Sequence, residues 1–98
     1  MISIRKARFE DLIQMQQLNV KCLPENYTFK FFYYHFISWP DLIFVAENLE
    51  TNEVVGYAMG KIEEGTDSLG KGHVTSLAVH RNFRKLGIAH KIMKMLHV

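Results

Sequence analysis

The feature that most constrains this chain is a change in the spacing of its apolar residues at Trp39-Pro40. Between residues 12 and 37, apolar residues recur every three or four positions, which is the spacing of the buried stripe of a helix. After it come short runs rich in β-branched and aromatic residues, which favour strands. Helices and strands within one short chain must share a core, so the pattern predicts a mixed α/β sandwich.

Two helices are predicted ahead of this change, and Pro24 separates them because proline breaks a helix. The first begins behind Glu10 and Asp11, since acidic residues suit a helix amino terminus. Its stripe is Leu12, Met15, Leu18 and Cys22. The stripe of the second is Phe29, Phe32, Tyr33, Phe36 and Ile37. Phe31 and Tyr34 lie off this stripe, and they indicate either a partner surface or an edge packed against the first helix.

Four strands and a last helix complete the predicted order βααβββα. A short strand covers about residues 1–6, where Ile2 and Ile4 alternate with polar residues. Residues 42–46 and 54–59 are expected to form an antiparallel hairpin around a polar turn. Residues 73–79 predict a fourth strand with an open edge. The apolar residues of the last helix are Ala89, Ile92, Met93 and Leu96.

Length and composition limit the class of protein. Ninety-eight residues, 48% of them hydrophobic and 22% charged, predict one globular domain spanning residues 1–98. The longest apolar run, residues 42–46, is far shorter than the roughly 20 residues of a membrane-spanning helix. The amino terminus lacks the pattern of a secretory signal, so residence in the cytoplasm is expected.

Metal and disulfide chemistry are both disfavoured by the sequence. Cys22 is the sole cysteine, which excludes an intrachain disulfide and a cysteine-based zinc site. Its place on the first helical stripe favours core packing over a role as nucleophile. The five histidines include no helical pair with a glutamate of the kind that zinc hydrolases use. No metal is therefore predicted.

Positive charge gathers in the last third of the chain, although the net charge is only +2. Asp67 is the last acidic residue, and six basic residues follow it: Lys71, Arg81, Arg84, Lys85, Lys91 and Lys94. This asymmetry predicts binding of an anion. A direct nucleic-acid reader is disfavoured, because the same segment holds only one aromatic residue, Phe83, for stacking on bases. A small phosphorylated ligand is favoured instead.

Two segments are candidates for holding its phosphates. Residues 65–72 nearly match a P-loop, but Gly72 replaces the required Ser or Thr and a strand follows where a helix should begin. Nucleotide hydrolysis is thus a remote alternative. Residues 84–89 lie where a strand gives way to a helix, so free amides and the helix dipole converge there. Gly87 and Ala89 add no bulk, which predicts a pyrophosphate site; the alternative is that Gly87 merely helps to start the helix.

Residues 73–84 together with 84–89 closely resemble the cofactor strand and loop of the GNAT acetyltransferases, whose pattern Arg/Gln-x-x-Gly-x-Gly/Ala is met. Within that superfamily, Leu23-Pro24-Glu25-Asn26-Tyr27, Ser38-Trp39-Pro40 and residues 72–79 resemble the catalytic subunits of NatA-type N-terminal acetyltransferases. NatB catalytic subunits carry a different link after the first helix. The resemblance runs along the entire chain and implies the amino-terminal portion of a GNAT-type mixed sheet flanked by helices.

The resemblance also implies an acetyl-CoA site and an adjoining substrate pocket. The residues implied for the cofactor are Leu77, Ala78, Val79, Arg84, Lys85, Leu86, Gly87, Ile88 and Ala89. Leu23, Pro24 and Tyr27 would form a wall that admits a small first side chain, and their alternative role is core packing. Glu25 would accept the proton of the substrate α-amine through water, and its alternative role is that of an exposed loop carboxylate.

Partners and location follow from the same resemblance. The implied substrates are nascent chains that begin with Ser, Ala, Thr, Gly or Cys after removal of methionine. The implied partner is the large auxiliary subunit of NatA, which would bring the protein to the ribosome, in the cytoplasm with the nucleus as a second location. The general acid and further substrate-binding residues, including an arginine and a tyrosine, are expected beyond residue 98. The alternative function is a catalytically incomplete module that docks on the auxiliary subunit.

Overall fold

The computed structural model describes residues 1–63 and 71–96, so most of the P-loop-like segment 65–72 lies outside the described residues. The predicted order of helices and strands is confirmed, with two 3₁₀ helices added before β2 and after β4. The elements are β1 (Ile2–Lys6), α1 (Asp11–Cys22), α2 (Phe29–Ser38), η1 (Pro40–Leu42), β2 (Ile43–Asn48), β3 (Glu53–Glu63), β4 (Lys71–Val79), η2 (Arg81–Leu86) and α3 (Ile88–Leu96).

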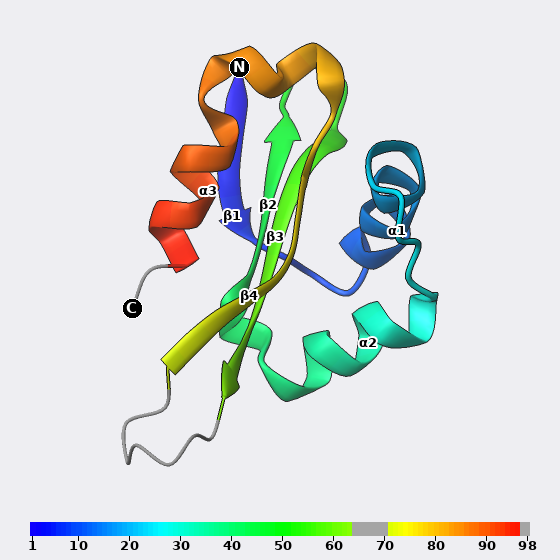
Figure 1. Cartoon of the computed structure of the whole chain (residues 1–98). Coiled ribbons are helices and arrows are strands. Elements are labelled where there is room, and N and C mark those ends of the chain that lie inside the picture. Colours follow the sequence, from blue (N-terminus) through cyan, green and yellow to red (C-terminus); the bar gives the residue numbers. More distant parts are fainter. Residues whose placement is uncertain (64–70, 97–98) are drawn as a thin grey trace.

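The four strands form one antiparallel sheet in the order β1-β2-β3-β4 (Figure 1). β4 therefore lies at an edge of the sheet in the described part of the chain, as predicted. Its pairing with β3 shifts between Met59 and Gly60, which face Ser76 and Val74. Thr75 is the extra residue of this bulge, and its hydroxyl donates to the Met59 carbonyl at 3.1 Å.

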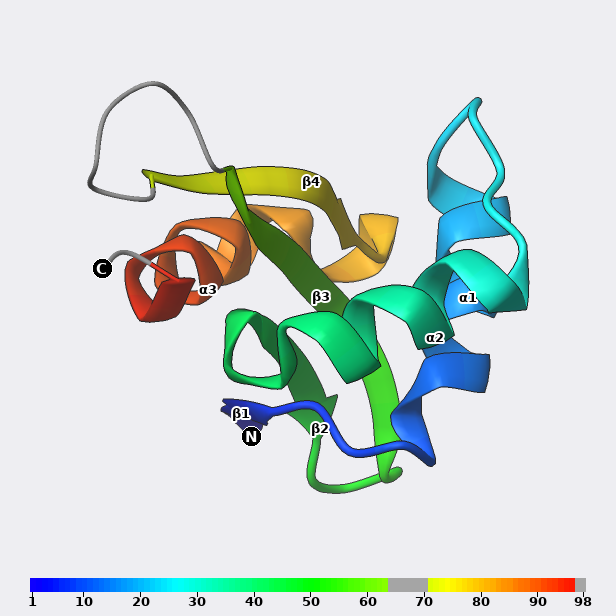
Figure 2. The same ribbon diagram turned by 90° about the horizontal axis from the view of Figure 1, so that it is seen from below.

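Helices cover both faces of the sheet. Figure 2 shows α1 and α2 on one face and α3 on the other. The buried residues on the α1/α2 face include Leu12, Met15, Leu18, Phe32, Ile43, Val45, Tyr57 and Met59. Those on the α3 face are Phe44, Ala46, Val55, Ala58, Val79, Ile88 and Ile92. Successive strand residues alternate between the two clusters, which is why the buried strands read as nearly continuous apolar runs.

The inward face of α2 differs from the predicted stripe. Phe32 and His35 are buried, whereas Tyr33 is 42% exposed and Ile37 is 59% exposed. The prediction for Tyr33 and Ile37 was therefore wrong. An α-helix turns by about 100° per residue, so once Phe32 faces the sheet its neighbour Tyr33 must point away. Tyr33 instead packs edge to face on Phe9 at the surface, with 5.7 Å between ring centroids.

Asp11 joins α1 to the sheet through an ion pair that its position in a first helical turn does not reveal. Its carboxylate accepts from Arg5 Nη1 at 2.6 Å, from Arg5 Nη2 at 3.0 Å and from the Arg8 amide at 2.7 Å. Arg5 also donates to Glu47 at 3.2 Å. Burial alone would raise the pKa of Asp11, but the bonds from Arg5 and Arg8 outweigh it and hold that pKa below its ordinary value.

No helix in residues 1–63 and 71–96 combines the length and apolar character needed to cross a membrane.

Candidate active site

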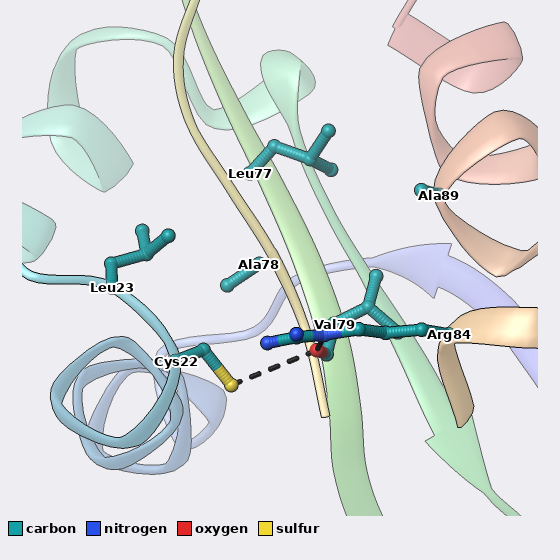
Figure 3. Close-up of a pocket in the computed structure, with 7 residues that line it drawn as sticks. All are labelled: Cys22, Leu23, Leu77, Ala78, Val79, Arg84 and Ala89. Atoms are coloured by element: carbon teal, nitrogen blue, oxygen red, sulfur yellow. Dashed lines mark hydrogen bonds between the residues drawn. The ribbon is translucent and has the colours of Figure 1, made fainter. Parts of the chain in front are cut away.

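One cavity brings distant parts of the chain together beside β4. It has a volume of about 350 Å³. Its lining residues are Cys22, Leu23, Leu77, Ala78, Val79, Arg84 and Ala89. They come from the end of α1, from β4, from η2 and from α3 (Figure 3). The structure thus places Leu23, from the predicted substrate wall, in one cavity with five of the residues predicted for the cofactor.

The backbone of β4 has free polar groups at this cavity. The His80 amide donates to the Val55 carbonyl at 2.7 Å, and Ala78 lies opposite Tyr57 in the ladder. Backbone groups of successive strand residues point in opposite directions, so those of Leu77 and Val79 point away from β3. The amide and carbonyl of Ala78 are used within the sheet, and Ala78 contributes its methyl group to the cavity. An extended ligand can therefore pair with the backbone of Leu77 and with the amide of Val79 in the manner of an added strand, whereas the Val79 carbonyl already accepts from Arg84 and Cys22.

The Val79 carbonyl is the meeting point of two donors at the cavity. Arg84 Nε donates to it at 2.9 Å. The Cys22 thiol donates to it at 3.6 Å, as the dashed line in Figure 3 marks. Arg84 is otherwise exposed, so it holds a positive charge at the cavity that an anionic ligand can reach. Cys22 does pack against the α1/α2 core as predicted, but it is only half-buried and also lines the cavity, which the prediction did not include.

The loop between η2 and α3 has the shape of an anion site. Gly87 has a φ of 72°, a conformation that favours glycine, and the space where a side chain would stand is open. Amides in the first turn of α3 have no helical partners and are directed toward the same end. Leu86 is exposed, Ile88 packs in the α3 core, and the side chain of Lys85 lies outside the described ones. Leu86, Gly87 and Ile88 are not among the residues that line the cavity, and only backbone contacts suit Gly87 and Ile88.

The loop between α1 and α2 carries the predicted substrate residues. Leu23 and Tyr27 are half-buried, and the Tyr27 ring stacks on Phe31 at a centroid distance of 4.2 Å and an angle of 15°. Pro24 and Glu25 are exposed, and neither lines the cavity. The structure therefore places Glu25 on the solvent side of the loop whose first residue, Leu23, reaches the cavity.

A buried polar chain beneath this loop was missed by the sequence analysis. Asn19 Oδ1 accepts from the Tyr27 amide at 3.0 Å, and Asn19 Nδ2 donates to the Tyr57 hydroxyl at 3.3 Å. The Tyr57 hydroxyl lies 2.7 Å from Ser76 Oγ. The signal was present in the sequence: Asn19 follows Leu12 and Met15 at the spacing of the buried stripe, so a polar residue had to be buried there.

Burial also shifts two ionisation equilibria on this side of the sheet. Burial raises the pKa of the Tyr57 hydroxyl, against the opposing effect of its bonds with Ser76 and Asn19. Tyr57 therefore stays neutral at ordinary pH. Burial lowers the pKa of His35, Lys61 lowers it further, and the bond of its ring to the Phe31 carbonyl opposes them. Since a carbonyl can only accept, His35 Nδ1 is the donor to Phe31, at 3.1 Å.

A larger cavity, of about 490 Å³, lies between α1, the start of β3 and η2. Its lining residues are Gln14, Gln17, Leu18, Lys21, Glu53, Val54, Val55, His80, Asn82 and Phe83. It contains none of the residues predicted for substrate or cofactor. The cavity at Val79 is thus the better candidate, because the free strand backbone, the arginine and the substrate loop meet there.

The side chains of the described residues do not gather into a group of three or more His, Cys, Asp or Glu that could hold a metal ion.

Comparisons with known proteins agree with this geometry. The model of the acetyltransferase (GNAT) family matches residues 12–97. The chain therefore belongs to the GNAT acetyltransferase family, and its mixed α/β architecture is that fold.

Within the family, the chain is similar to catalytic subunits of N-terminal acetyltransferases. It is 52% identical to the N-terminal acetyltransferase complex ARD1 subunit homolog of Dictyostelium discoideum, over 100% of this chain and 47% of that protein. It is 50% identical to the N-terminal acetyltransferase A complex catalytic subunit NAA10 of Arabidopsis thaliana, over 95% of this chain and 47% of that protein. The predicted resemblance to NatA catalytic subunits is confirmed, and the chain spans about half the length of these relatives.

Solved structures show the same arrangement of elements. The structure of the NatB acetyltransferase complex bound to CoA and MES aligns with a TM-score of 0.80 and 28% identity, covering 94% of this chain and 60% of that one.

Proposed function

We propose that this chain belongs to an N-terminal acetyltransferase that moves an acetyl group from acetyl-CoA to the α-amine of a protein. The observation that carries the proposal is the cavity at Val79, where the substrate loop, the free backbone of β4 and Arg84 meet. The names of the relatives from Dictyostelium and Arabidopsis, and the CoA in the NatB complex, support this reaction and this co-substrate.

The residues of the cavity suit the parts of acetyl-CoA. The outward backbone groups of Leu77 and the amide of Val79 can pair with the amide groups of the pantetheine arm. Arg84 and the amides around Gly87 suit the pyrophosphate, because they combine positive charge with an approach that no side chain blocks. Ala89 lines the cavity between these two regions, and its small side chain leaves room there for the ligand. Lys85, Leu86 and Ile88 complete the loop that we assign to the cofactor.

The transfer needs an unprotonated amine, whose ordinary pKa is about 7.7–8.0. The amine nitrogen attacks the thioester carbonyl, so a carbon–nitrogen bond forms and the carbon–sulfur bond breaks. The proton of the amine passes through water to Glu25, and the departing thiolate takes a proton from the surroundings. A carboxylate on an exposed loop can return its proton to solvent after each turnover.

The substrate class follows from the short loop after α1. Leu23 lines the cavity, and we assign Pro24 and Tyr27 of the same loop to the wall beside it, which would favour termini with a small first residue, namely Ser, Ala, Thr, Gly or Cys. We further propose the NatA auxiliary subunit as partner, contact with the ribosome through it, and action in the cytoplasm. The exposed aromatic and apolar side chains of α2, at Tyr33, Tyr34 and Ile37, support a protein partner on that helix.

The test measures acetyl transfer from labelled acetyl-CoA to a peptide that begins with serine. Glu25→Gln keeps the size of the side chain but removes the base, so kcat should fall roughly 10²-fold, at the low end for general base catalysis. Arg84→Gln should raise KM for acetyl-CoA and leave KM for the peptide nearly unchanged. Full activity of both variants would remove the assigned roles of the two residues.

The exposed aromatic residues of α2 also favour a second function, a module that docks on the auxiliary subunit without catalysis. The same assay separates the two functions. Stable binding of the auxiliary subunit with no acetyl transfer would support the docking module and overturn the enzyme proposal.

A further inference from the structure

We propose that Asn19, Tyr57 and Ser76 are positioning residues that hold the substrate loop, residues 23–27, at a set distance from β4. This inference rests on the proposed function and deepens it. It assigns the selection of small first side chains to a buried hydrogen-bond chain, in addition to the wall residues that face the substrate.

Asn19 binds both ends of the substrate loop. Its backbone carbonyl accepts from the Leu23 amide at 3.0 Å, where α1 ends. Its side-chain oxygen accepts from the Tyr27 amide at 3.0 Å, four residues further on. A single residue thus closes the loop into a ring, with Pro24 and Glu25 at its exposed tip. Any shift of the Asn19 side chain moves the end of the loop that carries Tyr27.

The chain then crosses to the strand that borders the cavity. The Tyr57 hydroxyl accepts from Asn19 Nδ2, which leaves its own proton free to point at Ser76 Oγ, 2.7 Å away. Ser76 directly precedes Leu77, whose backbone faces the cavity. The three polar side chains are at most 5% exposed. Water therefore cannot replace a lost partner, and the hydrogen-bonding groups of Asn19, Tyr57 and Ser76 are all paired in one arrangement only.

This arrangement links the two walls of the candidate site. Leu23 and Leu77 line the same cavity, and two links join the segments that carry them: the bond from the Cys22 thiol to the Val79 carbonyl at the cavity itself, and the buried hydrogen-bond chain Asn19–Tyr57–Ser76. With the chain intact, the gap between the walls has a defined width. With the chain cut, the loop can withdraw and larger first side chains can enter.

The experiment compares Tyr57→Phe with Gln14→Ala. Tyr57→Phe removes one hydroxyl and keeps the ring in the core. Gln14→Ala removes a different bond between α1 and β3, in which Gln14 Oε1 accepts from the Val54 amide at 2.9 Å, away from the loop. Two readouts are taken: hydrogen exchange at the Tyr27 and Leu23 amides, and kcat/KM for peptides that begin with Ser or with Leu.

We expect Tyr57→Phe to speed exchange at the Tyr27 amide and to lower the Ser-over-Leu preference by about tenfold, the upper range for one hydrogen bond. KM for acetyl-CoA should stay near the wild-type value, whereas KM for the Ser peptide rises. Gln14→Ala should change none of these quantities, even if it lowers the melting temperature. Ser76→Thr, which keeps a hydroxyl, should preserve the preference that Ser76→Ala weakens.

Two results would overturn the inference. One is unchanged exchange at Tyr27 in Tyr57→Phe, which would show that the chain does not hold the loop. The other is an equal loss of the Ser-over-Leu preference in Gln14→Ala. This result would show that the hydrogen-bond chain only stabilises the fold, as any bond between α1 and β3 does. If the wild-type protein transfers no acetyl group, the proposed function fails. The exchange measurement alone then still decides whether the hydrogen-bond chain Asn19–Tyr57–Ser76 holds the loop.

Discussion

The two faces of the sheet are built on different principles. Among the side chains that the structure describes, those buried on the α3 face are apolar, such as Phe44, Val55 and Ile92. The α1/α2 face buries an equally apolar set, but it also encloses the polar residues Asp11, Asn19, His35 and Ser76. Apolar contacts are not directional, whereas the hydrogen bonds of Asn19 and Ser76 fix the positions of their partners. The α3 face therefore contributes stability through apolar burial. The α1/α2 face does the same and also fixes the position of the substrate loop, residues 23–27.

The largest expected effect tests whether the α1/α2 face also depends on its apolar packing. Phe32→Ala removes a fully buried ring that packs edge to face on Tyr57, with centroids 5.8 Å apart. The free energy of unfolding should fall by about 3–5 kcal/mol, because the neighbouring side chains fill only part of the space that the Phe32 ring leaves. Chemical denaturation checks this value. A loss below about 1 kcal/mol would mean that this ring contributes little to the packing of α2 on the sheet.

A second prediction compares substitutions that preserve volume on each face. Asp11→Asn keeps the shape of the side chain but weakens the bonds from Arg5 and Arg8, so the free energy of unfolding should fall by about 1.5–3 kcal/mol. Ile92→Leu keeps the volume of a fully buried side chain on the α3 face and should cost less than about 1.5 kcal/mol. The same denaturation assay serves both. Equal losses would erase the proposed difference between the faces.

The smallest expected effect is a dependence of stability on pH that arises on the α1/α2 face. The pKa of His35 is lowered in the folded state, so below pH 6.5 the unfolded chain binds a proton that the folded chain does not. Stability should therefore fall as the pH drops from 6.5 toward the folded pKa. Groups that face His35 are Lys61 on β3 and the Phe31 carbonyl, and Lys61 strengthens this trend.

The measurement compares the free energy of unfolding at pH 7.5 and 5.5 for the wild type and for His35→Gln. The variant should lose the part of the decline that falls in this window. Asp11 does not interfere, because its lowered pKa puts its contribution below its ordinary value of 3.8. An identical decline in both proteins would assign the effect to other groups.

The fold could be predicted from the sequence because its elements carry strong apolar periods and clear stops. Leu12, Met15 and Leu18 lie on the buried face as their spacing predicted, and Pro24 separates the two helices. The pattern failed on α2, where six of the ten residues are Phe or Tyr. In such a helix the spacing allows several stripes, and Tyr33 is as good a candidate as His35 until the sheet selects one face.

The candidate site was predicted less completely. Residues close in sequence, such as Arg84 and Ala89, could be grouped because a strand, a glycine and a helix follow one another there. The inclusion of Cys22 in the same cavity could not be foreseen, since it lies 57 residues from Val79 along the chain. The roles assigned to Glu25 and to the cofactor loop stay predictions until the acetyl-transfer assay is done.

The sequence by itself determined the order of helices and strands, the family, and the loop that suits a phosphate, because these depend on local periodicity and on neighbours in the chain. The tertiary structure decided which face of α2 is buried, that Arg84 turns back to Val79, and that Asn19 reaches Ser76 through Tyr57. The physical reason is that a buried hydrogen bond depends on the distance between two groups in space, and residues far apart in the sequence acquire that distance only when the chain has folded.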